Sequence, residues 1–115
     1  LLDAGVNIGL ATDNVPTTLF YPMWHVVSRW NMISEDRIAP DQALSREDAL
    51  RCGTMGGAHL TFEEDKKGSI EEGKLGDMAV LSDDPLTCAE EKIKDIVAET
   101  TIVGGKIVYE REVST

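Results

Sequence analysis

The chain has 115 residues, of which 42% are hydrophobic, 28% charged and 5% aromatic, the composition of one globular domain. A formal charge of −10 argues against nucleic acids and anionic membranes as partners, because both require a cationic surface. No apolar run approaches the roughly 20 residues that span a bilayer, and no secretory signal is present, so we expect a cytoplasmic protein. Cys52 and Cys88 form no CxxC pair and are expected to be reduced thiols.

The first residues read as the end of a structural element. Leu1–Gly5 is typical of a last helical turn closed by a glycine, and no initiator methionine precedes it. We therefore expect a C-terminal piece of a longer protein. Both tryptophans and both histidines lie in the first half, whereas glycine turns and β-branched runs dominate the second. We place a boundary near Thr61, between a helical part over residues 1–60 and a strand-rich part over 61–115.

The earliest predicted element is a strand. Val6–Ala11 alternates between apolar and small or polar residues and then stops at the turn-forming run Thr12–Asn14. Gly9 inside this run indicates a crowded face on which only a hydrogen fits. The run is therefore predicted to be a strand that leads into a loop carrying Asp13.

Two helical segments are predicted next. Pro22 is well placed as the first residue of a helix of about 12 residues, whose apolar stripe extends from Leu19 to Ile33. A polar loop over residues 34–44 follows. Ser45 with an acidic residue three positions later resembles a capping box. It predicts a helix or helix pair as far as Leu60, interrupted by glycines that permit close backbone packing.

The second half is predicted to be mostly strands. Met78–Leu81 is a short apolar strand, and Ala89–Asp95 fits one helical turn. Ile96–Val103 and Lys106–Tyr109 flank Gly104–Gly105, which is a strong signal for a two-residue hairpin. A sheet that contains this hairpin is the expected centre of the second half.

Asp13 is the residue that best fits a catalytic role. Barrels of alternating strands and helices place catalytic groups just beyond the C-terminal ends of their strands. A carboxylate there can bind a divalent metal and can accept a proton from metal-bound water. Taken alone, the run Thr12–Pro16 fits an Asx turn ahead of a proline better. His25 and His59 lie in predicted helices and are expected to be packed side chains rather than metal ligands.

Several segments together resemble the amidohydrolase superfamily. They match, in order, its last barrel strand, the helix pair that follows, the return into a small β-sandwich, and the closing hairpin. The matching segments are Gly5–Pro16, Ser45–Arg51, Thr54, Gly57–Ala58, Gly68–Leu81, Asp83–Leu86 and Thr101–Glu110. Within the superfamily the chain most resembles the branch that contains N-substituted formamide deformylase, of which Thr61–Ser69 is typical.

The resemblance implies an α/β fold in which residues 1–60 form the last part of a (β/α)₈ barrel. Residues 61–115 would form the C-terminal part of the β-sandwich. It also implies one or two divalent metals, usually zinc, held mainly by histidines of earlier strands. Asp13 would ligate metal and shuttle a proton while metal-bound hydroxide attacks the carbonyl of a small amide-type substrate. Asn14–Tyr21 would line the substrate pocket.

The metal-binding histidines of the superfamily have no counterpart in this chain. A zinc site needs about three protein ligands, so the chain alone is expected to be inactive. The alternative is a non-catalytic structural module that associates with itself. Its homo-oligomer would form through a strand edge at Val6–Thr12 and an apolar helix face around Trp24 and Trp30.

Overall fold

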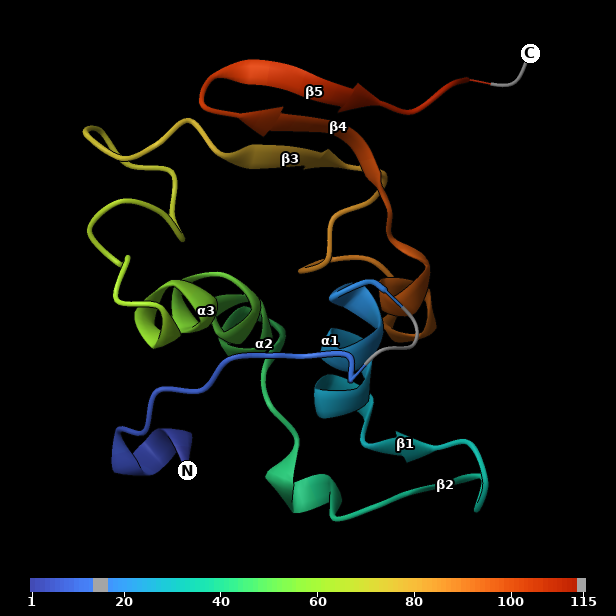
Figure 1. The fold of residues 1–115 in the computed structure, drawn as a ribbon. Helices are drawn as coiled ribbons and strands as arrows, with labels where there is room; N and C mark the ends of the chain where they lie inside the picture. Colours follow the sequence, from blue (N-terminus) through green and yellow to red (C-terminus); the bar gives the residue numbers. More distant parts are fainter. Residues whose placement is uncertain (14–16, 114–115) are drawn as a thin grey trace.

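Helices form one part of the fold and a three-stranded antiparallel sheet another in the computed structural model, which describes residues 1–13 and 17–113 (Figure 1). The helices are α1 (Phe20–Ser28), α2 (Arg46–Gly53) and α3 (Met55–Leu60), with 3₁₀ helices at Leu2–Ala4, Pro40–Gln42 and Glu90–Asp95. The sheet contains, in spatial order, β3 (Met78–Leu81), β4 (Ala98–Val103) and β5 (Lys106–Glu110). A separate hairpin joins β1 (Trp30–Asn31) to β2 (Asp36–Arg37). No helix in the described ranges is long and apolar enough to cross a membrane.

The predicted strand Val6–Ala11 is not formed in this structure. The run carries no strand assignment and pairs with no strand among the described residues. A strand requires a neighbour that accepts and donates backbone hydrogen bonds along its edge. Here the run crosses helices α2 and α3 instead (Figure 1), and the Leu10 amide donates to the Cys52 carbonyl at 3.2 Å. The glycine closure before it is confirmed: Gly5 has φ 77° and ends the first 3₁₀ helix.

The first long helix is confirmed, but it is shorter than the apolar stripe predicts. It begins at Phe20 and ends at Ser28, so Pro22 is its third residue, within the first turn, rather than its first. Arg29 adopts a left-handed conformation with φ 57° and donates its N–H to the His25 carbonyl, which closes the helix. Ile33 therefore lies beyond the helix and is 97% exposed.

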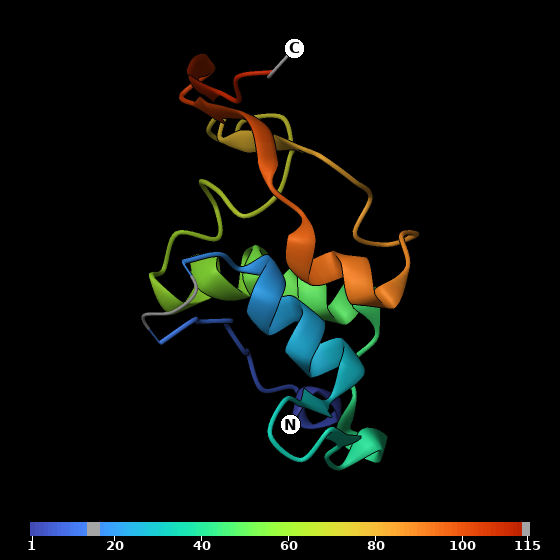
Figure 2. The ribbon, with the colours of Figure 1, turned by 90° about the vertical axis from the view of Figure 1, so that its right-hand side faces the viewer.

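The core forms where a late segment of the chain covers α1. Ile93, in the 3₁₀ helix Glu90–Asp95, is fully buried and belongs to one cluster with Met23, Trp24 and Ala49. Figure 2 shows this 3₁₀ helix lying against α1. Trp24 is thus only 6% exposed, so the predicted open apolar face around it is wrong. The side chain is covered by the same chain and is not free for a partner.

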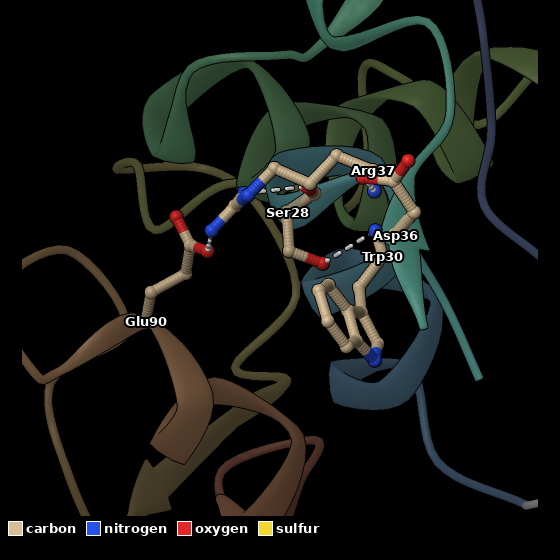
Figure 3. A network of polar contacts seen from close by, with 5 residues as sticks. All are labelled: Ser28, Trp30, Asp36, Arg37 and Glu90. Atoms are coloured by element: carbon tan, nitrogen blue, oxygen red, sulfur yellow. Dashed lines mark hydrogen bonds and ion pairs between the residues drawn. The ribbon is translucent and has the colours of Figure 1, made fainter. Parts of the chain in front are cut away.

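An arginine connects the β1–β2 hairpin to this core (Figure 3). One Arg37 nitrogen donates to the Ser28 carbonyl at 2.6 Å, and the other donates to Glu90 Oε1 at 2.8 Å. The buried Ser28 hydroxyl accepts the Trp30 amide at 3.2 Å. The last carbonyls of a helix lack intrahelical partners, and Arg37 donates to one of them. It thereby links β2 to α1 and to the 3₁₀ helix Glu90–Asp95.

The sheet confirms the strand predictions for the second half. Met78–Leu81 forms β3, and the hairpin of β4 and β5 turns at Gly104 and Gly105, whose φ values are 58° and 78°. Two consecutive positive φ angles are what a tight two-residue hairpin requires, and glycine adopts them without strain. β4 begins at Ala98 rather than Ile96, which is 2% exposed.

The α2–α3 pair is also confirmed, and its first residue gives a stability prediction. Ser45 caps α2, because its hydroxyl accepts the Asp48 amide at 3.1 Å. Ser45→Ala should lower the free energy of unfolding by about 1 kcal/mol, measured by urea denaturation. Ser45→Asp keeps an acceptor at the same place and should lose far less. Equal losses in both variants would contradict the cap.

Candidate functional site

Asp13 lies at the end of the extended run that crosses α2 and α3. It is exposed and has φ 51°, a left-handed conformation that few non-glycine residues adopt and that aspartate tolerates. Residues 14–16, which belong to the Thr12–Pro16 motif and to the predicted pocket lining, lie outside the described residues. The structure therefore places the candidate carboxylate at the surface, immediately after a segment held on a helix pair.

Close packing holds this segment on α2 and α3. A side chain at Gly56 would place its first carbon 2.0 Å from the Ile8 carbonyl oxygen, and one at Gly9 would lie 2.6 Å from Leu60 Cδ1. The prediction of a crowded face at Gly9 is confirmed, and close backbone approach is confirmed at Gly56 but not at Gly53 or Gly57. Beside the contact is a cleft of about 190 Å³, bordered by Ile8, Cys52 and other residues of the three segments.

Both histidines have partners within the protein. His25 Nδ1 lies 3.2 Å from the Trp30 carbonyl, and its ring packs 4.9 Å from Tyr21 and 4.8 Å from Trp24. His59 Nδ1 lies 3.8 Å from Glu64 Oε1. His25 is therefore packed as predicted, whereas His59 is exposed and the prediction of a packed side chain is wrong for it.

The part of the chain that the structure describes does not by itself form a metal centre. In residues 1–13 and 17–113, no three His, Cys, Asp or Glu side chains come together in a way that could hold a metal ion. A catalytic zinc ion requires about three protein ligands and an open position. The described residues therefore contain no such set of ligands.

A larger apolar cavity of about 550 Å³ lies between the helices and the sheet. Leu10, Met23 and Leu50 line it from one side, and Met78 and Ala79 of β3 line it from the other. Six separate stretches of the chain contribute to this cavity, so no local sequence signal could indicate it. Leu10 also connects the cavity to the run that carries Asp13.

The two cysteines are free, as the sequence predicts, and their surroundings differ. Burial raises the pKa of the Cys52 thiol, and the nearby Asp48 carboxylate raises it further. A raised pKa reduces the thiolate fraction at neutral pH, and the thiolate is the reactive form. Cys52 should therefore react with a maleimide at least about tenfold more slowly than the half-buried Cys88. Labelling rates of Cys88→Ser and Cys52→Ser measure each thiol alone, and equal rates would contradict this prediction.

Comparison with known proteins supplies the family. The sequence profile of the amidohydrolase family matches residues 1–109. An N-substituted formamide deformylase from Arthrobacter pascens is 37% identical over 114 residues, covering 96% of this chain and 21% of that protein. An imidazolonepropionase from Bacteroides fragilis is 31% identical over 110 residues, covering 93% of this chain and 24% of that protein. The chain belongs to the amidohydrolase family, as its sequence motifs predict.

A solved structure agrees with this assignment. An amidohydrolase from Thermotoga maritima MSB8 matches with a TM-score of 0.68 at 26% identity, over 96% of this chain and 25% of that one. The mixed helix-and-sheet fold is therefore similar to part of an amidohydrolase. The chain spans about a fifth to a quarter of the length of these proteins.

Proposed function

We propose that this chain forms part of a metal-dependent hydrolase that cleaves the C–N bond of a small amide-type molecule. Residues 1–60 would be the last part of its (β/α)₈ barrel, and residues 61–115 the C-terminal part of its β-sandwich. The observation that carries the proposal is the family match over residues 1–109, which includes the exposed Asp13. The similarity to a deformylase of N-substituted formamides supports a C–N bond as the target.

Asp13 is the residue to which we assign chemistry. Its carboxylate would contribute one ligand to a divalent metal, which we propose to be zinc, and would accept and return a proton during the reaction. When bound, such a metal supplies activated water and polarises the substrate carbonyl. Since this chain offers one ligand, we propose that it does not hydrolyse substrate alone.

A chimera tests the proposal. The stretch of the Arthrobacter pascens deformylase that this chain matches would be replaced by this chain, and hydrolysis of an N-substituted formamide would be measured. We expect turnover by the chimera, loss of turnover on treatment with a chelator, and recovery with Zn²⁺. This chain alone should show neither turnover nor tightly bound stoichiometric zinc.

The matched control is the deformylase from which the same stretch has been deleted, which should be inactive. A chimera that folds, binds zinc and fails to hydrolyse the formamide would argue against the proposed role of this chain. Stoichiometric zinc bound tightly by this chain alone would contradict its assignment as one part of a shared metal centre.

A second function is favoured by the apolar side chains on the surface. Ile33, Phe62 and Ile70 are 97%, 90% and 78% exposed, and the apolar residues of β5 are at least half exposed. Exposed apolar surface and open strand edges promote association between chains. A self-associating structural module would then form a homo-oligomer, which light scattering after size-exclusion chromatography would detect. A monodisperse monomer would contradict it.

A further inference from the structure

Gly56 and Gly9 allow the run before Asp13 to lie directly against the helix pair. A Cβ atom on Gly56 would lie only 2.0 Å from the Ile8 carbonyl oxygen. Carbon–oxygen contacts of this kind normally require about 3.3 Å or more, so an alanine at Gly56 must displace the Ile8 carbonyl or the helix by about 1 Å. The neighbouring Gly57 has nothing within 4 Å of the same position.

The junction between α2 and α3 supplies the second attachment. α2 ends at Gly53, so the Cys52 carbonyl has no partner one turn further along the helix. The Leu10 amide donates to it at 3.2 Å. The Cys52 carbonyl thus holds the run at Leu10. Gly56, one turn further along, contacts the same run at Ile8.

We propose that Gly56 is a positioning residue for Asp13, which is the third residue after Leu10. The inference rests on the proposed function, because it concerns the carboxylate to which that function assigns the chemistry. Gly56 touches no reacting group. It acts through the Ile8 carbonyl and the Leu10 hydrogen bond. Together these contacts fix the point at which the run leaves the helix pair, and therefore the position of Asp13.

The test compares Gly56→Ala with Gly57→Ala in this chain by NMR. Gly56→Ala should accelerate hydrogen exchange at the Leu10 amide by at least about tenfold relative to amides inside α1, and should shift the Asp13 amide resonance. Gly57→Ala makes the same chemical change in the same helix and should alter neither. Exchange that rises equally at Leu10 and in α1 reports general destabilisation, and would overturn the proposal.

A second pair of variants decides the matter if Gly56→Ala does not fold. Gly9→Ala meets only the flexible end of Leu60, at 2.6 Å, so its effect on Leu10 exchange should be smaller, about threefold. Leu60→Ala in the same chain removes the obstacle and should restore the original rate. If Gly9→Ala has no effect, or if Leu60→Ala does not restore the rate, the close contact does not hold the run and the proposal is overturned.

The catalytic arm uses the chimera. Gly56→Ala should lower kcat by about 100-fold with KM within twofold, because misplacement of a reacting group by about 1 Å is that costly. Gly57→Ala should leave both constants unchanged. If Asp13→Asn leaves turnover intact, the proposed function fails, while the Asp13 resonance still reports its placement. If Asp13→Asn is inactive but Gly56→Ala retains full kcat, the function stands and the positioning role is overturned.

Discussion

Asp13→Asn in the chimera is expected to lower turnover of the formamide by about 100- to 10,000-fold, the range that loss of a general acid–base group produces. The amide keeps the size of the carboxylate but cannot take up a proton, and it is a poor ligand for a hard divalent metal. Because Asp13 is exposed, the melting temperature should stay unchanged. Steady-state kinetics and thermal unfolding of the same preparation measure both effects.

Two further variants make this result specific. Asp3→Asn removes an exposed carboxylate from the first 3₁₀ helix and should leave turnover unchanged. Asp13→Glu retains the charge and the proton acceptor on a longer side chain and should recover part of the lost rate. Turnover of Asp13→Asn equal to that of the unmodified chimera would refute the assignment of Asp13.

Ile93→Ala should lower the free energy of unfolding by about 2–5 kcal/mol, the range for deletion of a fully buried aliphatic side chain. Ile93 is 0% exposed and packs in the cluster that contains Met23 and Trp24. Its removal opens a cavity beneath α1 and loosens the packing of the 3₁₀ helix Glu90–Asp95 on that helix. Urea denaturation of this chain measures the change.

The matched control is Ile107→Ala, because Ile107 lies on β5 and is 59% exposed. The same chemical deletion there should change the free energy of unfolding by less than about 0.5 kcal/mol. A loss at Ile93 no larger than at Ile107 would mean that the cluster around α1 does not contribute the stability that its burial implies.

Elements that depend on neighbouring residues could be predicted from the sequence. Ser45 caps α2 through an amide three positions away, and Gly104 and Gly105 make their turn through their own φ angles. In both cases the deciding interaction lies within a few residues, so the local pattern contains the necessary information. The same holds for Gly5, which closes the first helical turn.

Elements that depend on distant partners were predicted less well. Val6–Ala11 has the alternation of a strand, but a strand forms only beside another strand, and the described residues offer a helix pair instead. The stripe as far as Ile33 predicts a longer helix, yet the chain turns at Arg29 and pairs Trp30 with Arg37. Tertiary pairing thus overrides the helical periodicity of these residues.

The candidate site was predicted only in part. The role of Asp13 stays a prediction, which rests on its place after an apolar run and within a family motif. The Gly56 contact with Ile8 and the cavity beneath β3 arise from segments far apart in the chain and had no usable signal beyond the glycines themselves. The domain boundary near Thr61, the cytoplasmic location, the homo-oligomer, and the lack of nucleic acid or membrane partners stay predictions.

The packing of Ile93 against α1 has a consequence during synthesis of the chain. Trp24 and Ile93 are about 70 positions apart, so the helix emerges from the ribosome well before the residue that covers it. During that interval the nascent chain carries an uncovered tryptophan and methionine, which are features that chaperones bind and that promote aggregation. Emergence of residue 93 from the ribosome therefore marks the moment at which the early half of this chain can complete its core.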